Sequence, residues 1–354
     1  MTPSNVGLGL GLVSACVGGV ARDVYLATPG SYAALGGVSS FTRADATTCA
    51  EQFGASGVYA TALANVLRDA HYAYSPTLAA FARTILLEPT RAESAHGTTE
   101  FADTTYWSNS GPFTLTSKTS CLSGQTARLH TSGFANSNRR QTVGTFVNGQ
   151  TDLVWAILEN SNALISEIAV YDSTAGASLY LLQLTWSTLA LSNAVGSGAG
   201  RGVINLGTGP NGGQLVLLWA AATGTASGTG AAGHNRNNLL YPVGTSSASL
   251  ACIVHAAGLV PNTIFMSTPI VTVAAGVTQA VDALTLVGVP FAGTLFEHYF
   301  DESTGLWADS VAAYTASAAI TPTTGKAYSH IAVVESSTTL TAAQCKVAIG
   351  GVFP

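Results

Sequence analysis

The feature that most constrains the fold of this chain is a series of short apolar stretches, each bounded by turn-forming residues. They are "GTFVNGQTDLVWAILEN", "SEIAVYDSTAGASLYLLQLTW", "GGQLVLLWAAATGTASG", "SLACIVHAAGLV" and "ALTLVGVPFAGTLFEHYFDESTGLWADSVAAY". Each combines β-branched or aromatic residues with Gly, Asn, Asp or Ser punctuation, which is typical of antiparallel strands rather than of alternating strands and helices. The sequence therefore predicts an all-β chain.

Two turns are specific enough to predict hairpins. Asn148-Gly149 in "FVNGQTDLVW" is a strong two-residue hairpin signal, because both central positions of a type I′ turn need positive φ. "YFDESTGLW" predicts two strands joined by a polar loop that ends at Gly305. The glycine-rich stretches "GSGAGRG", "GTGPNGG" and "ATGTASGTGAAGHNRNN" predict loops at the rim of a sandwich, where binding residues commonly lie.

One region favours a helix. In residues 59–87 apolar residues recur at helical spacing, and Pro76 would end the helix. These apolar residues are Leu63, Val66, Leu67 and Ala70. The same region ends in "ILLEPTRAE", where Pro89 cannot donate to a strand ladder, so the chain is expected to leave its sheet there.

Composition restricts the class of protein. Charged residues make up 9% of the 354 residues and hydrophobic residues 47%, with 38 glycines. Roughly a quarter of the surface residues of a free helical enzyme are charged. The much lower charged fraction of this chain indicates a protein that is packed against other subunits in an assembly. The net charge of -5 comes without any run of Lys or Arg, and nucleic acid is therefore not an expected partner.

The cysteines and the first residues offer no cofactor site. The five cysteines form no CxxC pair, which predicts reduced, mostly buried thiols, with long-range disulfides as the alternative. "VGLGLGLVSACVGGVA" (6–21) is apolar, but the first basic residue follows it at Arg22 and the stretch is too short for a membrane span. It predicts an anchoring or oligomer contact, with an atypical signal segment as the alternative. The contact residues are Leu8, Leu10, Leu12, Val13 and Val17.

An ordered set of motifs resembles a family. "FTRADATTCAEQFGASGVYATALANVLRDAHYAYSPTLAAFARTILLEPTRAE" (41–93), then "FADTTYWSNSGPFTLT", then "LLYPVGTSSASLACIVHAAGLVPNTIFMSTPIVTVAAGVTQAVDALTL" (239–286) resemble the head spike, head fibre or tail-associated proteins of bacteriophages. The resemblance implies a central jelly roll similar to carbohydrate-binding modules. The chain departs from the family at "AHYAYSPTLAAFA" before the strand "ILLE", at Ala92-Glu93 after Arg91, and at "TQAVD". No ligand specificity is therefore carried over.

The resemblance implies three regions. Residues 1–88 would anchor the chain to the virion, residues 89–270 would form the jelly roll, and residues 271–354 would form a small C-terminal β domain. The implied location is the virion, assembled in the host cytoplasm. The implied partners are capsid or tail proteins, further copies of the chain and host polysaccharide. A trimer is expected by analogy with fibres.

Candidate glycan-binding residues occur in two places. An aromatic platform and paired hydrogen-bonding groups are what sugar recognition requires. The candidates are Tyr106 and Trp107 at the start of the sandwich, and His234, Asn235, Arg236, Asn237, Asn238 and Tyr241 in "GHNRNNLLY". The alternatives are that the tryptophan belongs to the core and that the loop contacts another protein.

Catalysis is not expected. The sequence has no nucleophile elbow, zinc-protease motif, phosphate loop or dinucleotide fingerprint, and its scattered acids specify no carboxylate pair. "FEHYFDES" (296–303) clusters acids, but a solvated hairpin tip explains it better than a metal site. Arg139-Arg140 could contact an acidic neighbour or an anionic polysaccharide. The expected function is a virion structural protein that displays a glycan-binding jelly roll. The first alternative is a glycan-binding adhesin module of a tail or cell-surface protein, and the second is a polysaccharide-degrading enzyme.

Overall fold

The structure is a computed structural model of the whole chain. It describes residues 13–17, 20–26, 38–42, 51–54, 57–61, 68–75, 80–86, 91–133, 137–244, 249–266, 268–272, 276–279, 283–287, 292–301, 304–314, 317–320 and 326–349. Within these ranges nearly all regular structure is β-strand, and the single helix is α2 (Ala342–Ile349). The predicted all-β class is confirmed.

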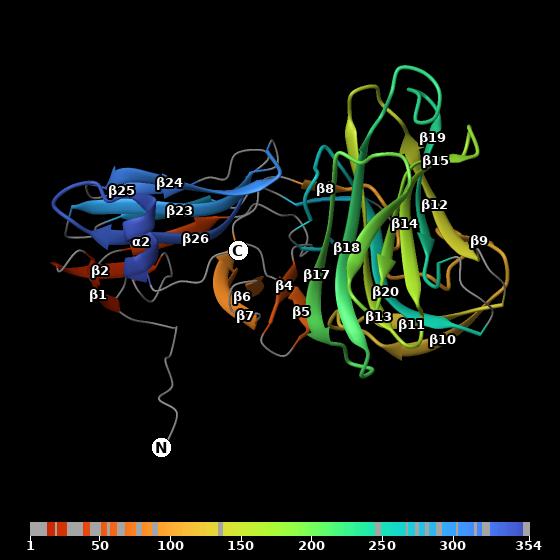
Figure 1. Cartoon of the computed structure of the whole chain (residues 1–354), viewed down its shortest axis with the longest axis horizontal. Coiled ribbons are helices and arrows are strands. Elements are labelled where there is room, and N and C mark those ends of the chain that lie inside the picture. Colours follow the sequence, from red (N-terminus) through yellow and green to blue (C-terminus); the bar gives the residue numbers. More distant parts are fainter. Residues whose placement is uncertain are drawn as a thin grey trace.

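A β-sandwich of two antiparallel six-stranded sheets fills the middle of the chain (Figure 1). The first, here the covered sheet, has the order β10 (Phe113–Thr119), β11 (Thr126–Ser132), β20 (Ala251–Pro261), β13 (Thr151–Asn160), β18 (Gln214–Thr223), β17 (Gly200–Thr208). The second, here the open sheet, has the order β16 (Ala190–Val195), β15 (Ala177–Thr185), β14 (Ile165–Asp172), β19 (Asn235–Tyr241), β12 (Asn138–Thr145), β9 (Ser108–Ser110). The chain crosses repeatedly between the two sheets, as in a jelly roll.

The Asn148-Gly149 turn forms, but it does not make the predicted hairpin. Gly149 has a φ of 78°, and the amide of Gln150 donates to the carbonyl of Val147 at 3.1 Å. The strands on either side, β12 and β13, nevertheless lie in different sheets. Turn chemistry fixes a local reversal but not the pairing partner. β13 instead pairs along its length with β18 and β20, whose apolar runs match its own.

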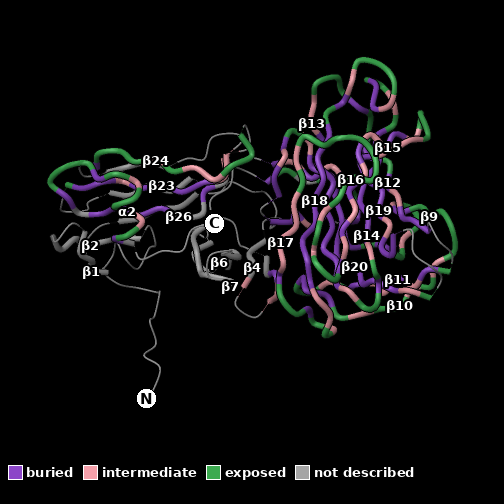
Figure 2. The backbone as a smooth tube through the Cα atoms, in the orientation of Figure 1, coloured by how far each residue is buried: buried purple, intermediate pink, exposed green. Residues whose placement is uncertain are grey.

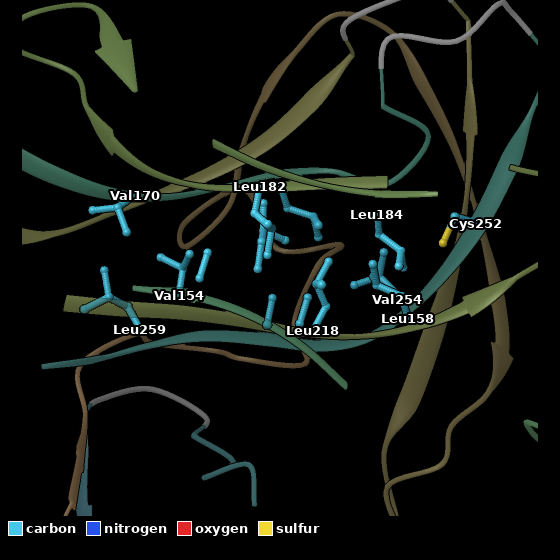
Figure 3. Close-up of a cluster of buried hydrophobic side chains, with 14 of the residues drawn as sticks. Val154, Leu158, Val170, Leu182, Leu184, Leu218, Cys252, Val254 and Leu259 are labelled. Carbon is cyan, nitrogen blue, oxygen red and sulfur yellow. The ribbon is translucent and has the colours of Figure 1, made fainter. Parts of the chain in front are cut away.

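The space between the two sheets holds the main core (Figure 3). Alternate residues of the covered sheet, such as Val154 and Leu218, face alternate residues of the open sheet, such as Val170 and Leu182. The alternation follows from the two-residue period of a strand. Trp186 and Cys252 close one part of this core, and Trp186 Nε1 donates to Ser166 Oγ at 2.8 Å.

The covered sheet has a second core on its other face. Trp155, Leu217 and Val260 point away from the sandwich interior and pack with Tyr59 and Phe265. As a result β13, β18 and β20 are buried along nearly their whole length (Figure 2). A strand that is buried on both faces has a nearly continuous apolar sequence, and the sequences of these three strands are of this kind.

Strands from the two ends of the chain share sheets. A five-stranded sheet has the order β1 (Val13–Val17), β2 (Val20–Leu26), β26 (Lys326–Glu335), β23 (Gly293–Asp301), β24 (Leu306–Tyr314). A three-stranded sheet has the order β25 (Ser317–Ile320), β22 (Ala283–Val287), β3 (Val38–Thr42). Strands from residues 1–88 and from residues 271–354 therefore pair with one another in both sheets. The β23–β24 hairpin with Gly305 in its turn is confirmed.

Three two-stranded sheets complete the fold. They pair β4 (Glu51–Phe53) with β5 (Tyr59–Thr61), β6 (Arg68–Ser75) with β7 (Ala80–Leu86), and β8 (Arg91–Glu93) with β21 (Val277–Gln279). The helix predicted within residues 59–87 is wrong, because β5, β6 and β7 occupy that region. Leu63, Val66 and Leu67 lie outside the described residues. Alanine-rich composition imitated helical periodicity, and the β6–β7 pairing prevailed.

The helix α2 was not predicted. Thr341 and Gln344 form a capping box, in which Gln344 Oε1 accepts from the Thr341 amide at 2.9 Å and Thr341 Oγ1 accepts from the Gln344 amide at 3.3 Å. Cys345 and Ala348 then pack against Phe296 and Val334 of the five-stranded sheet. In the described part of the chain, no helix has the length and apolarity needed to cross a membrane.

Candidate functional site

The outer face of the open sheet is not covered by the described elements of the five-stranded, three-stranded and two-stranded sheets. Those elements lie beside the covered sheet, on the opposite side of the sandwich (Figure 1). We call the outward-pointing side chains of β12, β19, β14, β15 and β16 the open face. Cross-strand partners in the register share a face of the sheet, so the register places these side chains in three rows.

The first row is polar and runs across all five strands. Tyr241 pairs with Glu167, Glu167 with Gln183, and Gln183 with Ser192. Gln183 Nε2 donates to Glu167 Oε1 at 2.7 Å, and Ser192 Oγ donates to Gln183 Oε1 at 3.4 Å. At the other end the hydroxyl of Tyr241 is hydrogen-bonded to the side chain of Asn138. The row thus holds two groups of hydrogen-bonded side chains, Glu167–Gln183–Ser192 and Tyr241–Asn138.

The second row is apolar. Leu239 pairs with Ala169, Ala169 with Leu181, and Leu181 with Val195. Ala169 and Leu239 are buried although they point outward. Arg140 pairs with Leu239 at the β12 end of this row, and its Nε donates to Ser108 Oγ at 3.4 Å.

The third row holds the most unusual residue of the face. Asn237 pairs with Thr142 on one side and with Tyr171 on the other. Its side chain is 0% exposed, and neither its Oδ1 nor its Nδ2 has a hydrogen-bond partner. A buried amide without partners costs about 1–3 kcal/mol relative to a satisfied one. Such a group needs an explanation, and a bound molecule is one where the face is otherwise uncovered.

The electrostatics of the face are set by burial. Burial raises the pKa of Glu167 above its ordinary value, while the hydrogen bond from Gln183 opposes that rise. Burial also raises the pKa of Tyr241, and the nearby Glu167 and Tyr171 raise it further. Both effects favour the neutral form of the group over its charged form, relative to a free side chain.

The predicted loop "GHNRNNLLY" is mostly the strand β19, and its side chains separate by alternation. Tyr241 lies on the open face, whereas Arg236 and Asn238 point into the sandwich. Arg236 pairs with Asp152, and Asn238 Nδ2 donates to the carbonyl of Gly258 at 2.9 Å. The structure thereby corrects the expectation that Arg236 and Asn238 contact a ligand at the surface.

The start of that segment lies at the rim. His234 Nδ1 lies 2.7 Å from Asp172 Oδ2, and Asn235 is exposed. Asp172 also accepts hydrogen bonds from the amides of Ala175 and Gly230, and together with His234 these lower its pKa although burial opposes them. His234 therefore ties two rim loops together.

The aromatic pair at the start of the sandwich does not form a platform. Trp107 is 0% exposed, belongs to the inter-sheet core, and its Nε1 donates to the carbonyl of Gly97 at 2.9 Å. Tyr106 is half-buried against the same core, with its ring edge-on to His96 at 6.3 Å. Trp107 is therefore a core residue, as the alternative interpretation of the sequence had it.

The predicted anchoring residues stay a prediction. Leu8, Leu10 and Leu12 lie outside the described residues, and for Val13 and Val17 the structure gives only the backbone of β1. Cys121, Cys252 and Cys345 are buried, and Cys252 and Cys345 are free, which agrees with reduced thiols at those two positions.

Sequence reasoning missed Glu167, Tyr171 and Gln183. A signal for them exists in "SEIAVYD", where Glu167, Ala169 and Tyr171 alternate with the core residues Ile168 and Val170. The alternation could not show which of the two sheets of the sandwich keeps its outer face open.

Comparison with known proteins gives distant similarity only. No protein-family model and no curated protein matches the sequence. Among solved structures, the CBM22-1 xylan-binding domain of Xyn10C from Paenibacillus barcinonensis is 11% identical with a TM-score of 0.27, over 53% of this chain and 96% of that chain. The CBM22-1-CBM22-2 tandem domain of the same protein is 9% identical with a TM-score of 0.29, over 72% and 93%. These values assign neither a family nor a ligand.

Proposed function

We propose that this chain is a glycan-binding module and that the open face of its sandwich binds a polysaccharide. The observation that carries the proposal is Asn237, whose buried amide faces outward without a partner. An amide offers an acceptor and a donor side by side, which matches two neighbouring hydroxyl groups of a sugar ring.

The arrangement of the three rows supports a sugar chain over a protein partner. A sugar ring has C–H groups on its faces and hydroxyls at its edges, and the open face has an apolar row between two rows of hydroxyl, amide and carboxyl groups. From β12 to β16 the face spans four inter-strand steps of about 4.8 Å, about 19 Å in all, which accommodates several linked rings.

We propose a binding role without catalysis. Hydrolysis of a glycosidic bond uses two carboxyl groups about 5–9 Å apart. The outward positions of β12, β19, β14, β15 and β16 carry a single carboxyl group, that of Glu167. Glu167 is instead engaged with Gln183 as part of the polar row.

Affinity electrophoresis tests the proposal. The chain is run through gels that contain one soluble polysaccharide each, covering neutral and acidic plant and bacterial-envelope polymers. We expect retardation by at least one polymer, and we expect Asn237→Ala and Tyr171→Ala to weaken it by tenfold or more. Asn109→Ala is the matched control, because Asn109 is exposed on β9 and pairs with the inward-facing Arg139. Equal retardation of all variants would place binding elsewhere, and no retardation by any polymer would refute the proposal.

The particle that carries the module is a separate question. The sequence resemblance predicts a phage virion, assembled in the host cytoplasm, with capsid or tail proteins and further copies of the chain as partners. Electron microscopy of virions labelled with an antibody to residues 326–349 checks this prediction. Removal of residues 1–40 is expected to abolish incorporation if the anchor lies there.

A further inference from the structure

The two arginines of "NSNRRQ" lie on opposite faces of β12. Arg140 lies on the open face, whereas Arg139 pairs with the core residue Leu240 and points between the sheets. Arg139 is 1% exposed, and this makes it one of the largest fully buried side chains of the described chain. The glycan-binding proposal gives it no role.

A second buried polar side chain, His130, shares the surroundings of Arg139. His130 pairs with the core residue Cys252 across β11 and β20, and it is 0% exposed. The ring of Phe113 contacts both groups, with Arg139 Cζ 5.9 Å above its centroid and the His130 ring edge-on at 5.5 Å. Phe101 lies edge-on to His130 at 5.8 Å and against Trp107 at 4.9 Å, so the walls around the pair are aromatic.

Neither group is satisfied by the described residues. Arg139 makes one long hydrogen bond, from Nη1 to the carbonyl of Trp107 at 3.4 Å, and its Nε has no partner. Both ring nitrogens of His130 lack a partner as well. Within the described part of the chain no carboxylate contacts Arg139.

The other buried arginines show how unusual this is. Arg236 pairs with Asp152 and donates from Nε to the carbonyl of Val143 at 3.0 Å. Arg91 donates to the carbonyl and the hydroxyl of Thr268 at 3.1 Å and 3.0 Å. Each has strong acceptors, as a buried guanidinium requires, because an unpaired buried charge is strongly destabilising.

The protonation states define what is missing. Burial lowers the pKa of Arg139 to about 10, so the guanidinium still carries its positive charge at neutral pH. Burial lowers the pKa of His130 well below its ordinary value, and Arg139 and Arg128 lower it further, so the imidazole is neutral and offers one N–H donor. The site thus combines one positive charge with unused donors and lacks a strong acceptor.

From this geometry we propose that Arg139 and His130 hold a small monovalent anion of chloride size inside the sandwich. The aromatic walls favour a monatomic ion over a large oxyanion. The anion supplies the counter-charge that Asp152 supplies to Arg236 at the other buried arginine. The site is structural and independent of the open face, because Arg139 and Arg140 point to opposite sides of the sheet.

Equilibrium unfolding in urea tests the assignment, since a buried ion exchanges when the sandwich opens. Unfolding is followed in mixtures of sodium chloride and sodium gluconate at constant ionic strength. Above the dissociation constant, the unfolding equilibrium constant is expected to fall about tenfold for each tenfold rise in chloride. Equal stability in chloride and gluconate would overturn the proposal.

Two variants locate the effect. Arg139→Met is expected to remove the chloride dependence, while Arg140→Met, which removes the neighbouring charge on the open face, is expected to keep it. A chloride dependence that survives Arg139→Met would also overturn the proposal. If Arg139→Met does not fold, His130→Phe decides: it keeps the charge but removes a donor, so the half-saturating chloride concentration is expected to rise severalfold, and an unchanged value contradicts the assignment.

Discussion

The two sheets of the sandwich have the same number of strands but differ in what covers their outer faces. The covered sheet buries Trp155, Leu217 and Val260 outside the sandwich as completely as it buries Val154 and Leu218 inside it. The open sheet keeps hydroxyl, amide and carboxyl groups on its outer face. The chain thus uses one outer face for its own packing, and the other is the face on which we propose that a glycan binds.

The largest expected effect contrasts an aromatic residue from each outer face. Trp155→Ala in the covered sheet should lower the free energy of unfolding by about 3–5 kcal/mol, because it opens a cavity in the second core. Tyr171→Ala on the open face should lower it by about 1 kcal/mol, because Tyr171 is only half-buried. Urea denaturation measures both values. Losses of similar size would mean that the two outer faces are equally covered.

The second prediction concerns Glu93 of β8, a buried carboxyl group that is hydrogen-bonded to Trp155 and Leu259 of the covered sheet. Glu93 accepts hydrogen bonds from the amides of Ala95 and Leu259 at 2.8 Å and 2.7 Å and from Trp155 Nε1 at 2.7 Å. Burial nevertheless raises its pKa from 4.5 to about 8. The native state therefore keeps a proton that the unfolded chain loses, and the free energy of unfolding should fall as the pH rises from 4.5 to about 8.

The slope that Glu93 contributes is at most about 1.4 kcal/mol per pH unit. Glu93→Gln should remove this contribution, although it should also lower the overall stability, because its amide would face the indole N–H of Trp155. Urea denaturation from pH 5 to pH 8.5 gives the slopes of the two proteins. An identical slope in both would show that Glu93 does not titrate in this window.

The third prediction concerns the carboxyl group of the open face. Burial raises the pKa of Glu167 too, so stability should again fall as the pH rises above the pKa of the unfolded carboxyl group. Glu167→Gln should reduce the pH slope by less than Glu93→Gln does, because burial raises the pKa of Glu93 to about 8 and raises that of Glu167 less. The same pH series measures it. A larger change in slope for Glu167→Gln than for Glu93→Gln would contradict this prediction.

The smallest expected effect is at the rim of the open sheet. Leu164 is 65% exposed just before β14, so Leu164→Ala should change the free energy of unfolding by no more than about 0.5 kcal/mol. Denaturation in urea checks this value. A loss above about 2 kcal/mol would indicate that another part of the chain covers Leu164.

The sequence was sufficient for the strands, because alternation and turn residues are local signals. It predicted the all-β class from these signals and the β23–β24 hairpin from "FEHYFDESTGLW", whereas the jelly roll was implied by the family resemblance. It failed where the outcome depends on distant partners. The Asn148-Gly149 turn gave no information on which sheet would take β13, and alanine-rich residues 59–87 imitated a helix until strand pairing decided otherwise.

The candidate site was only partly predictable for the same reason. Polar side chains in "GHNRNNLLY" suggested binding, and the alternation of β19 then divided them, with Tyr241 facing outward and Arg236 and Asn238 inward. Glu167 and Gln183 come from other strands and meet Tyr241 only through the register of the open sheet. No local pattern specifies that register.

Hydrogen exchange with and without a retarding polysaccharide tests the central claim most directly. If the open face binds the glycan, amide exchange should slow in β12, β14, β15 and β19 and stay unchanged in β10 and β11 of the covered sheet. Slower exchange confined to the covered sheet or to the rim loops around His234, with none in β14 and β19, would contradict the account.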